Sequence, residues 1–193
     1  PYDSMSVEMI AAMPLDRTDG TYRGPLKPSS EWRMHLDILR SRPEAGAVVH
    51  THSTFATALA ITRRNIPACH YMVAIFGGED VRCSEYARFG TQELSNAALA
   101  ALADRNACLL ANHGMITLGP TLEKAMWLAV ELETLAKQYY LALQIGDPVI
   151  LTREQIEETR AAMADYGHKA PPAEVRKGSG GSPKRKASRT RAA

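Results

Sequence analysis

The feature that most constrains this 193-residue chain is a short apolar run that ends in two histidines, Val48-Val49-His50-Thr51-His52. The β-branched residues before His50 predict an extended strand, and side chains two positions apart on a strand point to the same face. His50 and His52 would therefore direct both imidazoles into one small volume, as the chelation of a transition metal requires. A structural metal site would be expected to close with cysteines or a second paired motif, whereas a catalytic site keeps one position open.

Two residues elsewhere in the chain can complete such a site. His113 follows a second apolar run, residues 107–111, and Glu31 lies at the start of a predicted helix. Both histidine segments lie at the C-terminal ends of predicted strands, where the sites of α/β proteins gather. A single histidine is more often a core or surface residue than a ligand, so the spacing alone leaves a metal site and a purely structural role equally open.

Apolar periodicity and turn residues predict alternating strands and helices, which indicates a layered α/β domain. We expect strands over residues 9–13, 47–51, 70–76, 81–83, 107–111 and 115–118, with another near Tyr22. We expect helices over residues 31–40, 54–61, 91–104, 122–145 and 152–166, with N-caps at Ser29 or Ser30, Ser53 and Thr121. The length suits one domain with a sizeable core.

Composition excludes several classes of protein. Apolar residues make up 45% and charged residues 23% of the chain, as in ordinary globular proteins. The longest apolar run is far shorter than the ~18 residues that a membrane span needs, so we expect no membrane partner. Three cysteines without paired spacing argue against a secreted disulfide framework and favour a cytoplasmic location.

The basic residues concentrate at the C-terminal end. Seven of the 23 Lys and Arg residues lie from Arg176 onward, where there is no acidic residue, so the preceding part holds 16 basic against 21 acidic side chains. Residues 169–193 are rich in Pro, Gly and Ser, and we expect a disordered basic tail there. Because no aromatic residues are interleaved with these charges, we interpret the tail as a solvated extension and expect no nucleic-acid partner.

Several motifs together resemble the class II aldolase/adducin family. They include residues 28–35, 47–52, 86–91, 112–114 and 122–129. The resemblance covers residues 1–168, and within the family it is greatest to the branch that acts on L-fuculose 1-phosphate. It implies one three-layer α/β/α domain over residues 1–168 with a central, mostly antiparallel sheet. The N-terminal portion of the family domain, which completes the phosphate pocket, would be missing.

The resemblance also implies roles for individual residues. One Zn²⁺ per subunit would be held by His50, His52, His113 and Glu31. Glu31 would also be the catalytic acid–base residue, and the cation would stabilise the enediolate formed when the carbon–carbon bond is cleaved. Tyr71 would be a catalytic proton donor reaching the site from a neighbouring subunit of a homotetramer. Otherwise, Glu31 is a first-turn acid that stabilises a helix dipole and Tyr71 is a buried strand tyrosine.

Ser29 and Ser30 match hydroxyls that bind the substrate phosphate, although either can simply cap the helix. The implied activity is that of a zinc-dependent aldehyde-lyase. It would reversibly cleave a small-molecule sugar phosphate, such as L-fuculose 1-phosphate, into dihydroxyacetone phosphate and an aldehyde such as L-lactaldehyde. Two sugar-phosphate enzymes of the same family, a 4-epimerase and a methylthioribulose-phosphate dehydratase, share the histidines and stay open. A non-catalytic adducin-like interaction module is the alternative from another class, and it would be expected to lack them.

Overall fold

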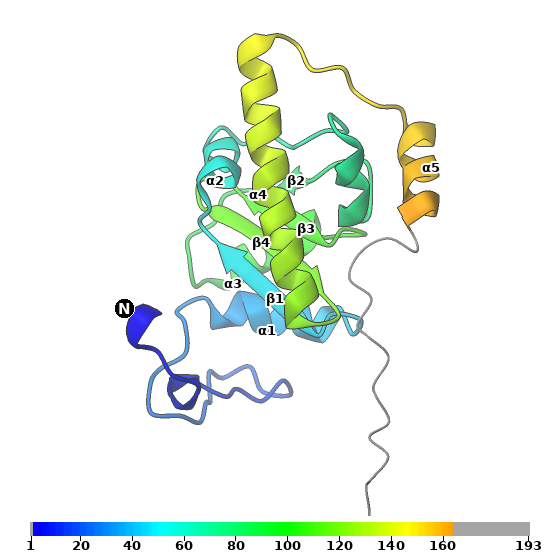
Figure 1. Ribbon diagram of the computed structural model, residues 1–193. Helices are drawn as coiled ribbons and strands as arrows, with labels where there is room; N and C mark the ends of the chain where they lie inside the picture. The colour runs from blue at the N-terminus through cyan, green and yellow to red at the C-terminus, as the bar shows by residue number, and fades with distance from the viewer. Residues whose placement is uncertain (1, 164–193) are drawn as a thin grey trace, which may run out of the picture.

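A computed structural model describes residues 2–163, which form a mixed four-stranded sheet between two layers of helices (Figure 1). The strands are β1 (Ala47–Thr51), β2 (Arg82–Cys83), β3 (Ala107–Leu110) and β4 (Gly114–Gly119), in the order β1-β4-β3-β2. β4 pairs antiparallel with both β1 and β3, and only the short β2 pairs parallel with β3. The predicted three-layer α/β/α architecture with a mostly antiparallel sheet is confirmed.

Helices cover both faces of the sheet, and in Figure 1 the long helix α4 runs across one of them. One layer consists of α1 (Trp32–Ser41) and α3 (Gln92–Ala101). The other consists of α2 (Thr54–Ile61), α4 (Leu122–Ile145), the 3₁₀ helix η3 (Tyr71–Phe76) and α5 (Arg153–Met163).

The alternation of side chains along the strands decides which face each residue serves. On β3, Cys108 packs in the cluster with α1 and α3, whereas Leu109 packs in the cluster with α2 and α4. On β1, Val48 packs on the α1 side and Val49 on the α4 side. Because His50 follows Val48 by two positions, its side chain faces the layer that contains α1.

The predicted strand over residues 70–76 is wrong, since this segment forms η3. The ring of His70 accepts a hydrogen bond from the backbone N–H of Met72 at 3.2 Å and so starts the helix, and Gly77 ends it at φ 97°. Val73 and Phe76, three positions apart, are completely buried. A short apolar run does not distinguish a strand from a buried helical turn by its periodicity.

The two strands predicted before residue 25 are also wrong. The segment contains the 3₁₀ turns η1 (Tyr2–Ser4) and η2 (Val7–Met9), and a single antiparallel bridge joins Ala12 to Arg23. Ile10 keeps 61% of its surface exposed, so the segment buries too little apolar area to form part of the sheet. Figure 1 shows this segment beside α1 and outside the sheet.

The other predicted elements are confirmed within a few residues at their ends. α3 stops at Ala101 rather than residue 104, and α5 is described as far as Met163. The predicted tail, residues 169–193, lies outside the described residues. Among the helices of residues 2–163, none is both long and apolar enough to cross a membrane.

Candidate metal centre

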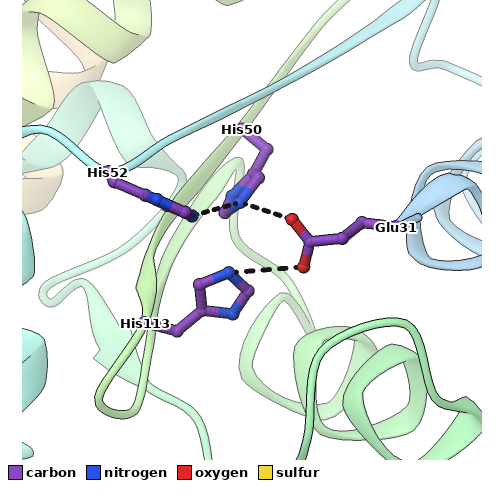
Figure 2. Close-up of side chains that lie close together, drawn as sticks. All are labelled: Glu31, His50, His52 and His113. Atoms are coloured by element: carbon purple, nitrogen blue, oxygen red, sulfur yellow. Dashed lines mark hydrogen bonds and ion pairs between the residues drawn. The ribbon is translucent and has the colours of Figure 1, made fainter. Parts of the chain in front are cut away.

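Four side chains from three separate parts of the chain converge on one point (Figure 2). His50 lies on β1, His52 directly follows that strand, and His113 lies in the hairpin between β3 and β4. Glu31 comes from the start of α1. One donor atom from each residue lies within 4.8 Å of all the others, so the set predicted from the sequence is brought together.

The start of α1 leaves the Glu31 carboxylate free to reach the histidines. Glu31 occupies the N-cap position, but its side chain makes no capping hydrogen bond, and its backbone N–H donates to Ser29 Oγ at 3.2 Å. Its Oε2 lies 3.1 Å from His50 Nε2, and its Oε1 lies 3.3 Å from His113 Nε2. The side chain is only 11% exposed, which weakens the screening of its charge by water.

The hairpin that carries His113 fits closely against β1. Leu110 pairs with Gly114 to close it, and Asn112 between them adopts a left-handed conformation at φ 55°. A Cβ on Gly114 would collide with the Thr51 carbonyl and lie 2.9 Å from Cδ2 of His52. Only glycine lets the hairpin backbone approach the histidine segment this closely.

A backbone carbonyl orients the His50 ring. Its Nδ1 lies 2.9 Å from the Met115 carbonyl oxygen, which can only accept, so Nδ1 carries the hydrogen in this contact. In the neutral ring, Nε2 then presents its lone pair toward the other three side chains. A hydrogen bond of this kind on the second ring nitrogen is typical of metal-binding histidines.

The cluster has more acceptors than donors. His50 Nε2 lies 3.1 Å from both His52 Nε2 and Glu31 Oε2, and the buried Glu31 Oε1 has only the 3.3 Å ion-pair contact to His113 Nε2 and no hydrogen bond. A buried carboxylate oxygen without a donor costs free energy. A divalent cation would satisfy all four groups, and three imidazoles with one carboxylate suit Zn²⁺ and other first-row metals. The residues therefore fit a metal ion.

The protonation of His113 also suits metal binding. Burial lowers the pKa of its imidazole, the Glu31 carboxylate partly opposes this effect, and the neighbouring His50 and His52 lower it further. The neutral form, which is the form that binds metals, therefore persists to lower pH than in an isolated histidine.

The cluster opens into a cavity of about 350 Å³. Its walls are formed by Ser30, Glu31, His52, Tyr86, Ala87, Phe89, Asn112 and His113. Ser29 is not among them, and its hydroxyl oxygen accepts from the backbone N–H of Glu31. Tyr86 and Phe89, which the sequence placed only in a motif, are 57% and 60% exposed and give the cavity an apolar side.

Tyr71 does not belong to this cavity in the single chain. It lies on η3, its ring centroid is 4.6 Å from that of His70, and it keeps 49% of its surface exposed. It is therefore not the buried strand tyrosine considered as the alternative. Its role as a donor from a neighbouring subunit stays a prediction.

The prediction that Ser53 is the N-cap residue of α2 is confirmed, but the capping hydrogen bonds are made by the side chain of another residue. Ser53 occupies the N-cap position, but its hydroxyl lies 3.5 Å from Met115 Sδ and makes no capping bond. Instead, the Glu133 carboxylate of α4 accepts from the backbone N–H groups of Phe55 and Ala56 at 2.8 and 2.9 Å. No local sequence pattern indicates a cap contributed from 78 residues away.

The chain is similar to several known proteins. The family described as Class II Aldolase and Adducin N-terminal domain matches residues 1–140. The 5-methylthioribulose-1-phosphate/5-deoxyribulose-1-phosphate aldolase of Rhodospirillum rubrum is 56% identical over 153 residues, which are 79% of this chain and 69% of that protein. The L-fuculose phosphate aldolase of Escherichia coli K12 is 45% identical over 168 residues, 86% of this chain and 77% of that one. A solved L-fuculose 1-phosphate aldolase superposes with a TM-score of 0.79 at 38% identity, covering 84% of this chain and 75% of its own.

We predict that Gly114→Ala weakens metal binding at least tenfold, because the added methyl group displaces the hairpin from β1 and His113 from the other ligands. The affinity for Zn²⁺ can be measured by competition with a chromophoric chelator. Gly146→Ala is the matched control, since a Cβ there meets nothing within 4 Å. Equal Zn²⁺ affinity in the two variants would contradict the prediction.

Proposed function

The chain belongs to the class II aldolase and adducin family, and we propose that it cleaves a ketose 1-phosphate reversibly into dihydroxyacetone phosphate and an aldehyde. Its similar curated relatives are aldolases, and the chain is an aldehyde-lyase of this class. The observation that carries the proposal is the convergence of three imidazoles and one carboxylate, three of which line a cavity.

We propose that one Zn²⁺ per subunit is the metal and that His50, His52, His113 and Glu31 hold it. When bound, the cation supplies Lewis-acid stabilisation of the negative charge that develops on the ketone oxygen of the substrate. The neutral imidazoles leave most of its positive charge available for this purpose, because only Glu31 among the four ligands is anionic.

The proton transfers are assigned to Glu31 and Tyr71. In the condensation direction, Glu31 removes a proton from C3 of dihydroxyacetone phosphate, and the resulting carbanion attacks the aldehyde carbon. A proton from the Tyr71 hydroxyl of a neighbouring subunit then neutralises the aldehyde oxygen as the C3–C4 bond forms. Cleavage is the reverse: the C4 hydroxyl loses its proton to Tyr71, the C3–C4 bond breaks, and Glu31 returns a proton to C3.

The two sides of the cavity suit the two halves of the substrate. Ser30 lines the cavity just before α1, where its hydroxyl and nearby backbone N–H groups can bind the phosphate. Ser29 lies beside it, and its hydroxyl accepts from the Glu31 backbone N–H but keeps its own hydrogen to donate to a phosphate. Tyr86 and Phe89 offer an apolar wall to the aldehyde half. 5-Methylthioribulose, 5-deoxyribulose and L-fuculose, the sugars in the names of the relatives, all end in an apolar methyl or methylthio group.

Among these substrates we favour 5-deoxyribulose 1-phosphate and 5-methylthioribulose 1-phosphate over L-fuculose 1-phosphate, because the Rhodospirillum rubrum relative has the higher identity. The 4-epimerase and dehydratase alternatives are less well supported, since relatives at 40% identity or more from Rhodospirillum rubrum, Escherichia coli and Haemophilus influenzae are named aldolases. An adducin-like module without catalysis would not need a complete set of metal-binding histidines.

We predict that the metal-loaded protein releases dihydroxyacetone phosphate from 5-deoxyribulose 1-phosphate and 5-methylthioribulose 1-phosphate with higher kcat/KM than from L-fuculose 1-phosphate. Reduction of the released product by a coupled NADH-dependent dehydrogenase measures the rate. Prior removal of the metal by a chelator should abolish release from all three substrates, and Zn²⁺ should restore it. Undiminished activity in the metal-free protein would contradict the proposed chemistry.

We predict that Glu31→Gln lowers kcat for cleavage by about 10²- to 10⁴-fold, the usual contribution of a general acid–base group. The three histidines still bind the metal in this variant, because glutamine removes only the charge and the basic oxygen. Metal content is measured alongside turnover to separate the two effects. Turnover equal to that of the wild-type protein would refute the role of Glu31.

We propose that the protein is a homotetramer in which Tyr71 of one subunit completes the site of the next, because Tyr71 is exposed and does not line the cavity of its own chain. Mixing refolded Glu31→Gln and Tyr71→Phe subunits should then restore about a quarter of wild-type activity, since random assembly pairs an intact Glu31 with an intact Tyr71 at that frequency. No gain over the separate variants would place Tyr71 outside the neighbour's site.

A further inference from the structure

Helix α2 connects the two histidine segments of the cluster. Only Ser53 separates His52 from the first residue of α2, so the position of the helix constrains the backbone at His52. At its other end, the Ala60 carbonyl accepts from the backbone N–H of Asn112 at 3.0 Å, and the Ile61 carbonyl accepts from Asn112 Nδ2 at 3.3 Å. Asn112 is adjacent to His113. A shift of α2 would therefore move both histidine segments.

Helix α2 has eight residues, too few to be stable in isolation, so its position depends on contacts with the rest of the fold. At its C-terminal end the contact is with the hairpin. At its N-terminal end the contact is with Glu133, whose two carboxylate oxygens each accept one backbone N–H, from Phe55 and Ala56. Hydrogen bonds to an ionised acceptor are stronger than neutral ones, and a negative charge at a helix N-terminus is stabilised by the helix dipole.

We propose that Glu133 is a positioning residue of the metal centre. By holding the N-terminal end of α2 against α4, Glu133 fixes the backbone that carries His52, and through the helix it fixes the Asn112 contact beside His113. This inference rests on the proposed function only in so far as the cluster binds a metal.

The exposure of His52 makes this backbone control important. Its side chain is exposed, whereas His50 and His113 have side chains only 10% and 13% exposed. Surrounding packing therefore restricts the ring of His52 least, and the direction of its backbone determines whether Nε2 reaches the other donors. Metal ligands must lie within a fraction of an ångström of their productive positions, and residues that orient them affect affinity almost as strongly as the ligands do.

The test compares Glu133→Ala and Glu133→Gln with a control that loses a helix cap far from the site. Thr121→Ala removes the hydroxyl that accepts from the backbone N–H of Lys124 at 3.2 Å at the start of α4. For each purified full-length variant, the Kd for Co²⁺, the visible spectrum of the Co²⁺ complex and the Tm without metal are measured. Co²⁺ is suitable because its absorption bands respond to the number and geometry of its ligands.

We expect Glu133→Ala to weaken Co²⁺ binding by about 10- to 100-fold and to change the visible spectrum, as for other residues that orient metal ligands. Glu133→Gln keeps one acceptor and should fall between Glu133→Ala and the wild-type protein. Thr121→Ala should lower the Tm but keep the wild-type spectrum and a Kd within about twofold, because loss of a cap alone reduces stability without moving the ligands.

An unchanged Kd and spectrum in Glu133→Ala would overturn the proposal, as would an equal loss of affinity in Thr121→Ala. If Glu133→Ala does not fold, wild-type affinity in Glu133→Gln would overturn it. The aldolase assay of the wild-type protein separates this inference from the proposed function. A wild-type protein that binds Co²⁺ but cleaves no ketose 1-phosphate would refute the aldolase assignment, while the affinity ratios would still decide the role of Glu133.

Discussion

The cluster at the end of β1 imposes a constraint on the whole structure, because it gathers electron-pair donors that repel one another without a cation. Glu31 brings a carboxylate with 11% of its side chain exposed to within 3.1 Å of His50, and one of its oxygens is buried without a hydrogen bond. Such an arrangement has an electrostatic cost in the absence of positive charge. The fold holds these groups in place through backbone contacts that do not depend on the cluster itself.

The sheet register supplies the first of these contacts. His50 is paired with Ile116 and Thr51 with Met115, so the Met115 carbonyl lies where it can accept from His50 Nδ1. A shift of one residue between β1 and β4 would turn His50 to the opposite face, toward α4. Val48 packs in one hydrophobic core and Val49 packs in the other, so a shift of one residue would move each valine to the opposite core. The packing of these two valines therefore resists the shift. The core therefore determines which face of the sheet carries the three histidines and Glu31.

The sequence predicted the parts of the site that depend on local periodicity. The His50 and His52 spacing on a β-branched run, and the apolar run before His113, indicate strands whose ends carry the histidines, and β1 has the predicted bounds of residues 47–51. Glu31 is a candidate from the sequence because it lies at the start of a predicted helix, but its place opposite these strand ends follows only from the family resemblance, since nothing in the spacing relates α1 to β1. The sequence predicts a strand at η3 because a short run that buries Val73, Ala74 and Phe76 fits a strand and a helical turn equally well. The Glu133 cap could not be predicted, because it depends on how α4 crosses α2.

Different kinds of contact hold the four metal-binding candidates and the apolar wall of the cavity. The four metal-binding candidates come from a sheet, a closed hairpin and a helix start, and they are held by paired backbone, a glycine contact and the cap of α2. Tyr86 and Phe89, in contrast, lie in a segment without regular secondary structure and expose more than half of their surface. Substitutions there would alter few packing contacts of the core, whereas changes at Gly114 or Glu133 would affect the geometry of the cluster. Under the proposed function, selectivity for the aldehyde half of a substrate could therefore vary on this scaffold without disturbing the four candidate metal ligands, because different physical contacts maintain the two.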